Sequence, residues 1–427
     1  MTALEVSGGQ PLCGRVQVPG DKSISHRALI LAARAGGVSV LQGLSKGDDV
    51  TRTAAAIQSL GAGVEHVGLD SGEIETRVTG GVDRLSQSEV PIDVGNSGTT
   101  IRLLSGFCAP FPWLTVLTGD ESVSRRPMDR VVQPLRQMGA HVDCQPGCVA
   151  PLTVHGGSLT GIEYHPPVAS AQLKSAVLLA GLGAEGDTVV YERERTRCHT
   201  EEMLAACGAD VNVSADGLVT RVRASELHPF ELDVSSDPSQ AAFWVVAACI
   251  IPGSDVVVER VYVGPRRTGF VDVLRRMGAK VDVEPVDAHT ADIHARYGPL
   301  HATEVGGEEV PGLIDEIPVL AVAAAMAEGV TTFHGAGELR VKETDRIATM
   351  SDELRSIGVH AAAMADGLVV HGGNPLHDGQ VRSHGDHRVA MALAVAGLGS
   401  TGTTRIDGWE AVATSYPGFE SDLQSLL

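Results

Sequence analysis

Basic side chains gather in four short segments of this 427-residue chain, and each of these segments also holds a carboxylate. Arginine presents a planar fork that matches carboxylate and phosphate groups, and a neighbouring carboxylate or lysine can transfer protons. These residue types predict a site for a substrate with two or three negative charges and for acid–base chemistry on it. The segments are PGDKSISHR (19–27), SRRPMDR (124–130), ELRVKETDR (338–346) and GDHR (385–388).

The segment 338–346 has the densest charge. On a helix, Lys342 and Arg346 would lie four residues apart and share a face, with Glu343 beside them. A solvated helix with ordinary ion pairs explains this pattern about as well as a site does. Asp315 and Glu316 could likewise simply cap the apolar helix that follows them. The pattern alone leaves both interpretations open.

Glycines and small polar residues precede another apolar helix in the segment GNSGTT (95–100). Gly98 lets the backbone approach a ligand closely, and Asn96 offers an amide group. Neither a Gly-Lys-Ser/Thr loop nor a GxGxxG pattern is present here, so nucleoside-triphosphate chemistry is not supported. In segment 124–130, Arg126 precedes Pro127, which we expect in the first turn of a helix.

The composition is globular but acidic, with a formal net charge of −20 and only 4% aromatic residues. This charge argues against nucleic acid and acidic membranes as general partners, and the aromatic content argues against a base-stacking platform. An anionic substrate would therefore need a local basic island. Only five residues are lysines, and Lys22, Lys174 and Lys342 lie in or beside the candidate segments.

Membrane insertion and disulfide bonding find little support in the sequence. The longest apolar run, 241–251, is too short to span a bilayer, and the first residues lack the parts of an export signal. The seven cysteines are scattered without a CxxC pair, which predicts reduced thiols in place of a disulfide framework or zinc site. We therefore expect a cytoplasmic protein without a bound metal.

A pattern of helix end, glycine and strand recurs along the chain. Glycine commonly follows the last residue of a helix, so each copy predicts a surface helix that leads into a strand. The copies lie 69 to 80 residues apart, and about six such units would fill the chain. The glycines are Gly61, Gly139, Gly208, Gly278 and, in a weaker copy, Gly358.

A second series of helices has the same spacing and is apolar on nearly all sides, which predicts burial. These helices are expected to begin near residues 27, 100, 173, 241, 317 and 388, each followed by a strand, so the fold class is α/β. A short polar segment precedes all six. If the six helices are related by pseudo-symmetry, their N-termini can converge, and free N–H groups there bind phosphates and carboxylates. For any single helix, ordinary capping is the better explanation; the six together favour a site.

The chain resembles the EPSP synthase family, the 3-phosphoshikimate 1-carboxyvinyltransferases, from PGDKSISHRALI near its start to ATSYPGF near its end. The resemblance implies transfer of the enolpyruvyl group of phosphoenolpyruvate to the 5-hydroxyl of shikimate 3-phosphate, with release of phosphate, by addition and elimination through a tetrahedral intermediate. It implies no cofactor. The motifs that carry it are PGDKSISHR, GNSGTTIR, SRRPM, SAQLKSA, IDEIPVLAVAA, ELRVKETDR and DHRVAMA.

The resemblance also implies a two-domain, pseudo-symmetric α/β fold, an inside-out α/β barrel. Each domain would hold three of six repeated units, with buried helices that converge on the interdomain cleft. One domain would cover 19–235 and the other 1–18 plus 236–427, with hinge crossings near 18–20 and 233–238. A monomer is expected.

The site residues follow from the resemblance, motif by motif. Asp315, Glu343 and Lys22 would be catalytic: Asp315 would orient or deprotonate the 5-hydroxyl, and Glu343 or Lys22 would exchange protons with the enolpyruvyl carbons. The shikimate 3-phosphate site would comprise Lys22, Ser23, Arg27, Ser170, Ala171, Gln172, Arg197, Asp315 and Lys342. The phosphoenolpyruvate site would comprise Lys22, Asn96, Gly98, Arg126, Gln172, Lys342, Arg346 and Arg388.

Three positions depart from patterns common in the family. Thr414 stands where many members have a lysine, Cys198 where a related branch has a hydrogen-bonding residue, and Leu103 where glyphosate-sensitive members usually have proline. Gly98, however, is retained where glyphosate-tolerant members commonly have alanine. We therefore expect glyphosate to inhibit, because Gly98 leaves room beside phosphoenolpyruvate.

Three alternatives remain at this point. An enolpyruvyl transferase acting on UDP-N-acetylglucosamine would share the fold, but it would carry a loop cysteine where this chain has Glu121. A non-catalytic anion-binding protein would not need Lys22, Asp315 and Glu343 together. A phosphoryl-transfer enzyme would need a phosphate loop and metal-binding carboxylates.

Overall fold

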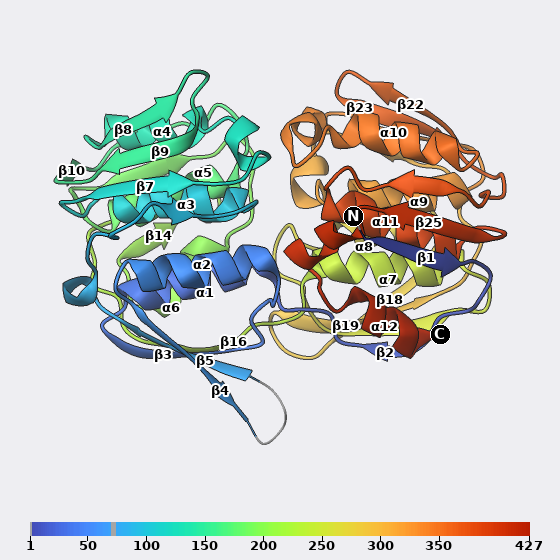
Figure 1. Ribbon diagram of the computed structural model, residues 1–427, viewed down its shortest axis with the longest axis horizontal. Helices are drawn as coiled ribbons and strands as arrows, with labels where there is room; N and C mark the ends of the chain where they lie inside the picture. Colours follow the sequence, from blue (N-terminus) through green and yellow to red (C-terminus); the bar gives the residue numbers. More distant parts are fainter. Residues whose placement is uncertain (1, 70–73) are drawn as a thin grey trace. The chain divides into compact units, whose positions relative to one another are not determined.

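The computed structural model describes residues 2–69 and 74–427, and its helices and strands alternate as in an α/β protein. The chain divides into two compact units (Figure 1). Unit 1 consists of residues 1–21 and 235–427, and unit 2 of residues 22–234. Each unit has its own hydrophobic core.

Unit 2 contains six α-helices and fourteen strands within the described residues. They are α1 (Lys22–Arg34), β3 (Gly37–Gln42), α2 (Asp48–Ser59), β4 (Gly63–Gly68), β5 (Ile74–Gly80), β6 (Ile92–Asp93), α3 (Gly98–Cys108), β7 (Leu114–Thr118), α4 (Asp129–Gln137), β8 (His141–Gln145), β9 (Val149–His155), β10 (Leu159–Thr160), β11 (Glu163–Tyr164), α5 (Ala171–Gly181), β12 (Ala184–Glu185), β13 (Thr188–Tyr191), α6 (His199–Ala206), β14 (Val211–Val213), β15 (Val219–Val222) and β16 (Glu231–Asp233).

Unit 1 begins with two strands and continues after the chain returns from unit 2. Its elements are β1 (Ala3–Ser7), β2 (Cys13–Val16), α7 (Pro238–Ile250), β17 (Asp255–Tyr262), α8 (Gly269–Arg276), β18 (Lys280–Pro285), β19 (Thr290–Arg296), β20 (Glu304–Val305), α9 (Ile317–Met326), β21 (Val330–Phe333), α10 (Arg346–Ser356), β22 (His360–Met364), β23 (Gly367–His371), β24 (Gln380–Arg382), α11 (His387–Leu398), β25 (Thr403–Asp407) and α12 (Phe419–Leu426).

Five four-stranded sheets share one pairing pattern. In unit 2 the strand orders are β16-β3-β5-β4, β6-β7-β9-β8 and β11-β13-β15-β14, and in unit 1 they are β2-β17-β19-β18 and β20-β21-β23-β22. In each sheet the first two strands are parallel and the other pairs are antiparallel. A sixth sheet, β24-β25-β1, has three strands, with a parallel and an antiparallel pair.

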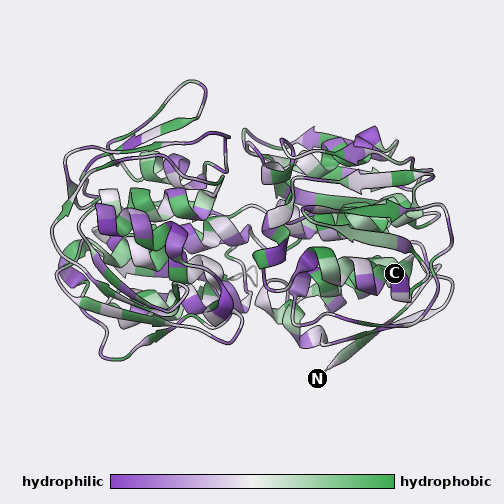
Figure 2. Cartoon of the chain, turned by 90° about the horizontal axis from the view of Figure 1, so that it is seen from above, coloured by the Kyte–Doolittle hydropathy of each residue, from purple (hydrophilic) through white to green (hydrophobic). Residues whose placement is uncertain are grey.

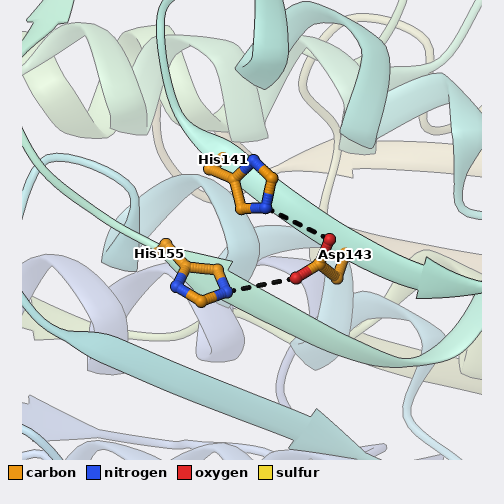
Figure 3. Close-up of side chains that lie close together, drawn as sticks. All are labelled: His141, Asp143 and His155. Carbon is orange, nitrogen blue, oxygen red and sulfur yellow. Dashed lines mark hydrogen bonds and ion pairs between the residues drawn. The ribbon is translucent and has the colours of Figure 1, made fainter.

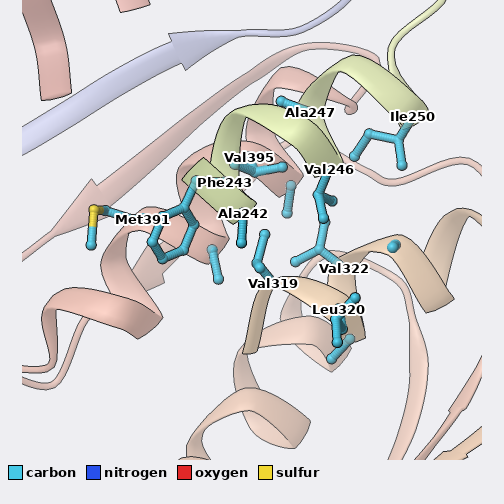
Figure 4. Packing of buried hydrophobic residues seen from close by; sticks show 14 of the residues in the cluster. Ala242, Phe243, Val246, Ala247, Ile250, Val319, Leu320, Val322, Met391 and Val395 are labelled. Atoms are coloured by element: carbon cyan, nitrogen blue, oxygen red, sulfur yellow. The ribbon is translucent and has the colours of Figure 1, made fainter. Parts of the chain in front are cut away.

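The apolar helices expected from the sequence are confirmed as α1, α3, α5, α7, α9 and α11, and most of their residues are buried. In unit 1, α7, α9 and α11 contact one another, and Phe243, Val319 and Met391 are among the side chains packed between them (Figure 4). Figure 2 shows hydrophobic stretches inside each unit and hydrophilic residues mainly on outer elements and loops. These helices are hydrophobic all round because a sheet or another helix covers every side.

The predicted glycine after each surface helix is also confirmed. At all five positions the backbone has a positive φ, between 82° and 104°. Residues with a Cβ atom rarely adopt this conformation, whereas glycine adopts it without strain. The turn from helix to strand is therefore encoded by one residue in each copy: Gly61, Gly139, Gly208, Gly278 and Gly358.

Two local predictions are wrong. The segment 338–346 does not form one helix: a 3-10 helix covers Gly337–Val341, and α10 begins at Arg346 because Asp345 caps it, accepting a hydrogen bond from the Ala348 amide at 3.0 Å. Pro127 is not in the first turn of a helix either, since α4 begins two residues later at Asp129. Both errors concern where a helix begins, which sequence patterns predict less well than the presence of the helix.

A buried ion pair lies beside both points where the chain passes between the units. Arg267, 1% exposed, binds Asp21 at 2.5 Å and Asp237 at 2.8 Å. Burial lowers the pKa of Arg267, but Asp21, Asp237 and Glu316 raise it by more, so the pKa is raised overall. The guanidinium therefore stays charged and holds the two crossing segments together within unit 1.

The contact between α3 and α5 depends on Gly106. A Cβ atom at this position would lie 2.0 Å from the carbonyl oxygen of Ala176, which belongs to the α5 backbone. We predict that Gly106→Ala lowers the free energy of unfolding by about 1–3 kcal/mol, because the two helices must separate. Urea denaturation measures this. The matched control is Gly68→Ala, where no atom of the described residues beyond the adjacent ones lies within 4 Å of the added Cβ. Equal stability of both variants would contradict the prediction.

Among the described residues, no helix is long and apolar enough to cross a membrane.

Candidate active site

The guanidinium of Arg346, at the first position of α10, lies among three carboxylates in unit 1. Its Nε is 2.8 Å from Asp386 Oδ2, its Nη2 is 2.6 Å from Glu343 Oε2, and its Nη1 is 3.4 Å from Asp315 Oδ1. Only 2% of the Arg346 side chain is exposed. One cation therefore fixes the positions of the two carboxylates predicted to be catalytic, Asp315 and Glu343.

Two further predicted residues converge on Asp315, which lies two residues before the start of α9. Lys342 Nζ lies 3.6 Å from Asp315 Oδ1. Arg388, in the first turn of α11, donates a hydrogen bond from Nη1 to the Asp315 carbonyl at 3.2 Å, and its Nε lies 3.9 Å from Oδ1. All five residues predicted for this part of the site therefore form one cluster: Asp315, Lys342, Glu343, Arg346 and Arg388.

Electrostatics in this cluster keep Arg346 charged. Burial lowers its pKa, but the charges of Asp386, Glu343 and Asp315 raise it by more, so the pKa lies above its ordinary value. Buried guanidinium groups that remain cationic are suited to bind carboxylate or phosphate. The loop before α10, and not the predicted helix face, brings Glu343 to this guanidinium and Lys342 to Asp315.

In unit 2, the predicted residues of α1 are already bound to neighbouring side chains. Lys22 Nζ forms an ion pair with Asp49 of α2 at 2.8 Å, and both side chains are largely buried. Arg27 donates from Nε to Thr200 Oγ1 and from Nη2 to Ser175 Oγ, both at 2.7 Å. These bonds connect α1 with α5 and α6 and fix the direction of Arg27.

Ser23 lies one turn before Arg27, and its carbonyl oxygen accepts a hydrogen bond from Arg27 Nη1 at 2.9 Å. Ser170 is the N-cap of α5, where its hydroxyl accepts a hydrogen bond from the Leu173 amide at 3.3 Å, and Ala171 opens that helix. Arg197 lies just before α6 and is half-buried. Ser170 thus fulfils the capping role that was the plainer explanation of its position.

The N-termini of α3 and α5 meet at Gln172. Its amide nitrogen donates to Thr99 Oγ1 at 3.0 Å, and its Oε1 accepts from Arg102 Nη1 at 2.8 Å. Asn96 lies two residues before α3, and its Oδ1 is buried with no hydrogen-bond partner among the described residues. A buried amide oxygen without a partner is costly, so it is a plausible position for a ligand donor.

Arg126 lies against the backbone of α3 at Gly98. A Cβ atom on Gly98 would lie 2.4 Å from Arg126 Nη1 and 3.2 Å from Arg102 Nη1. Only 7% of Arg126 is exposed. Glycine at position 98 therefore allows a guanidinium to approach a helix N-terminus, where N–H groups and positive charge favour anions.

Lys174 is not part of this cluster, although its position in the sequence placed it beside the candidate segments. Its ammonium group lies in the core of unit 2, 2.6 Å from Glu192 Oε2 and 2.6 Å from Glu201 Oε1, with 1% of the side chain exposed. It joins α5 to α6 and to the residue after β13. Its role is therefore structural.

The three departures from the family pattern have different surroundings. Cys198 is the N-cap of α6, and its thiol donates to Glu202 Oε1 at 2.9 Å. Burial raises the pKa of Cys198 to about 12, so Cys198 remains a protonated thiol. This position therefore keeps a hydrogen-bond donor. Leu103 is fully buried in α3, and Thr414 ends a 3-10 helix, Trp409–Thr414.

Sequence reasoning missed three residues that orient the site. Asp386 both caps α11, through the Arg388 amide at 2.9 Å, and binds Arg346. Asp49 pairs with Lys22, and Arg102 binds Gln172. Asp386 lies inside the motif GDHR and was a detectable candidate, whereas the partners of Asp49 and Arg102 are 27 and 70 residues away and give no local signal.

Solved structures identify the class of fold. An EPSP synthase from Acinetobacter baumannii matches with a TM-score of 0.86 at 40% identity, over 99% of this chain and 98% of that one. The enolpyruvyl transferase NikO from Streptomyces tendae matches with a TM-score of 0.80 at 20% identity, over 99% of this chain and 97% of its own. The chain has the α/β fold of EPSP synthase structures.

The particular family follows from the sequence comparisons. A family model described as EPSP synthase (3-phosphoshikimate 1-carboxyvinyltransferase) matches residues 6–423. The 3-phosphoshikimate 1-carboxyvinyltransferase of Gloeobacter violaceus is 50% identical over 99% of this chain and 98% of its own length, and that of Acaryochloris marina is 46% identical over 97% and 94%. The chain belongs to the EPSP synthase family and is a transferase of aromatic amino-acid biosynthesis by the shikimate pathway.

Proposed function

We propose that this chain transfers the enolpyruvyl group of phosphoenolpyruvate to the 5-hydroxyl of shikimate 3-phosphate and releases phosphate. The observation that carries the proposal is the cluster around Arg346. It combines two carboxylates, Asp315 and Glu343, with three cationic side chains in a chain of this family. Carboxylates beside cations supply the proton transfers, and the cations neutralise a substrate with several negative charges.

The addition moves two protons, and the elimination that follows moves one. In the addition, the 5-hydroxyl oxygen bonds to C2 of phosphoenolpyruvate, the hydroxyl loses its proton, and the methylene carbon C3 gains one. In the elimination, C3 loses a proton and the bond from C2 to the phosphate oxygen breaks. We assign removal of the hydroxyl proton to Asp315, and proton exchange at C3 to Glu343 with Lys22 as the alternative group.

The binding roles are proposed by motif and are supported by the local geometry. Phosphoenolpyruvate would be held by Lys22, Asn96, Gly98, Arg126, Gln172, Lys342, Arg346 and Arg388. Shikimate 3-phosphate would be held by Lys22, Ser23, Arg27, Ser170, Ala171, Gln172, Arg197, Asp315 and Lys342. The support is that Arg126 lies against the N-terminus of α3 and that Arg27 and Arg346 are held in fixed directions by several partners.

The proposal includes a domain organisation. The two domains would be 19–235 and 1–18 plus 236–427, each with three repeats of an inside-out α/β barrel and joined by hinge crossings near 18–20 and 233–238. We further propose that the protein is a monomer and that it is cytoplasmic. Seven cysteines that are all free thiols support the cytoplasmic location.

Phosphate release tests the proposed function. Purified protein is given phosphoenolpyruvate with either shikimate 3-phosphate or UDP-N-acetylglucosamine. We expect release with shikimate 3-phosphate alone, and we expect Asp315→Asn to remove it. Release with the nucleotide sugar would change the substrate assignment. A folded sample that binds shikimate 3-phosphate in calorimetry but releases no phosphate would favour a binding protein.

Gly98→Ala should weaken phosphoenolpyruvate binding selectively. The added methyl group would lie 2.4 Å from Arg126 Nη1, so the guanidinium must move away from the α3 N-terminus. We predict that KM for phosphoenolpyruvate rises about tenfold, equivalent to about 1.4 kcal/mol, while KM for shikimate 3-phosphate changes little. Gly157→Ala, where the added Cβ meets no atom within 4 Å, is the control. Equal increases in both KM values would contradict the assignment of Gly98 to phosphoenolpyruvate.

Glyphosate should inhibit the enzyme in competition with phosphoenolpyruvate. Because residue 98 is glycine, no side chain at this position displaces the Arg126 guanidinium, which lies against the N-terminus of α3. Turnover is measured over a range of both concentrations. Unchanged turnover at glyphosate concentrations far above the phosphoenolpyruvate KM would show that retention of Gly98 does not determine sensitivity here.

A further inference from the structure

Three metal-ligating side chains converge on one exposed face of the β8–β9 hairpin in unit 2 (Figure 3). His141 and Asp143 are two residues apart on β8, and His155 lies opposite His141 on β9. Residues with this spacing and pairing point to the same face of a sheet. A metal site needs at least three histidine, cysteine, aspartate or glutamate side chains whose ligand atoms lie close together. Within the described parts of the chain, this group alone meets that condition.

The distances suit a small divalent transition metal. His141 Nε2 lies 3.2 Å from Asp143 Oδ1, and His155 Nε2 lies 3.1 Å from Asp143 Oδ2. Zinc bonds to histidine nitrogen and carboxylate oxygen at about 2.0–2.2 Å, so ligand atoms at neighbouring corners of a zinc tetrahedron are about 3.3 Å apart. The side chains therefore need to turn only slightly to share one ion.

We propose that His141, Asp143 and His155 bind one divalent transition-metal ion of the zinc type, with water in the remaining position. Two imidazoles and one carboxylate favour Zn²⁺, Cu²⁺ or Ni²⁺ over Mg²⁺ or Ca²⁺, which take mainly oxygen ligands. The site lies outside the residues assigned to the transferase reaction. The sequence-based expectation of no metal rested on the spacing of the cysteines. It did not take account of His141 and His155, which are fourteen residues apart.

Unit 1 contains a similar pair of histidines that serves as an internal control for the proposed site. His360 and His371 are directly paired on β22 and β23, with ring centroids 4.3 Å apart, as His141 and His155 are on β8 and β9 at 4.9 Å. Two residues beyond His360 stands Ala362, where β8 has Asp143. The unit 1 pair therefore has the histidines without the carboxylate, and we expect it to bind zinc more weakly.

Calorimetric titration with Zn²⁺ tests the proposal. The chain carries no affinity tag, and bound metal is first removed with a chelator. We expect one tight site per chain. His141→Ala and Asp143→Asn should each weaken it at least about tenfold, whereas His360→Ala should leave it unchanged. The hairpin also holds two neighbouring thiols, Cys144 and Cys148, whose sulfur atoms are 2.8 Å apart. The titration is therefore repeated on a Cys144→Ser, Cys148→Ser variant.

Two results support the proposal together: binding that persists without the two thiols and binding that is lost with His141 or Asp143. Hydrogen exchange gives an independent measurement, since zinc should slow amide exchange in β8 and β9 and not in β22 and β23. Three results would overturn the proposal: no zinc binding, binding that disappears in the serine variant, or equal loss with His360→Ala.

Discussion

Glu343→Gln should lower kcat about 10²- to 10⁴-fold and leave KM for phosphoenolpyruvate nearly unchanged. Glutamine keeps an oxygen that can accept the hydrogen bond from Arg346 Nη2, now 2.6 Å from Glu343 Oε2, so the guanidinium stays in place. The glutamine amide cannot gain or lose a proton, however, so no side chain at position 343 can exchange a proton with C3 of phosphoenolpyruvate. Steady-state kinetics with both substrates measures the effect.

The matched control for this variant is Glu328→Gln, because Glu328 is 86% exposed and its Oε2 lies 3.9 Å from His301 Nδ1, beyond hydrogen-bond distance. Its kcat should equal that of the unchanged chain. A single-turnover experiment then separates the proton roles: Asp315→Asn should slow formation of the tetrahedral intermediate, and Glu343→Gln should slow both its formation and its decay. A Glu343→Gln enzyme with normal kcat would assign the C3 proton to Lys22.

Lys174→Met should destabilise unit 2 by about 3–5 kcal/mol. The change removes the cation from a core that still holds two carboxylates, Glu192 and Glu201, each 2.6 Å from the ammonium group in the intact chain. Buried charges without a partner are costly because water cannot solvate them. Hydrogen exchange of α5 and α6 peptides, followed over a range of urea concentrations, measures the loss in unit 2 by itself.

Lys280→Met provides the control for this loss. It makes the same substitution at an exposed lysine on β18, where a change in stability of less than about 0.5 kcal/mol is expected. If Lys174→Met also changed stability by less than about 1 kcal/mol, the buried ion cluster would not hold α5 in place. Loss of activity in Lys174→Met should follow unfolding, since Lys174 is not among the residues assigned to substrate.

The elements that the sequence predicts best are those with a strong local signal. The inner helices are predictable because runs such as 241–251 are apolar on every side. A helix that is surrounded by the core has no face in contact with water, so it needs no polar face. The surface helix ends were recognised because Gly61, Gly139 and the equivalent glycines adopt a positive φ that favours this residue. In each case one residue or one segment determines the local structure.

One helix start and one set of contacts between distant segments were not predicted. The start of α10 depends on the cap at Asp345, so the charged segment before it is a loop and not the helix face that its spacing suggested. Lys174 has the same residue type as Lys22 and also lies near a helix N-terminus, yet its partners Glu192 and Glu201 make it structural. The cap is a local contact that the charge spacing does not reveal, whereas Glu192 lies 18 residues from Lys174 and gives no local signal.

The site itself was predicted unevenly. Its unit 1 residues were named from motifs, and the structure gathers them around Arg346. Asp386 was overlooked because a cap explained it, although the same carboxylate both caps α11 and binds Arg346. A residue that satisfies a structural role can therefore also orient a functional group.

Deuterium incorporation tests the central claim most directly. The reaction is run in D₂O with phosphoenolpyruvate and shikimate 3-phosphate, and the product is examined by NMR. Addition and elimination predict a carboxyvinyl ether at the 5-oxygen with deuterium in its methylene group, because C3 gains a solvent proton and later loses one of three. A carboxyvinyl ether without deuterium would contradict the proposed mechanism, and absence of the ether would contradict the proposed function.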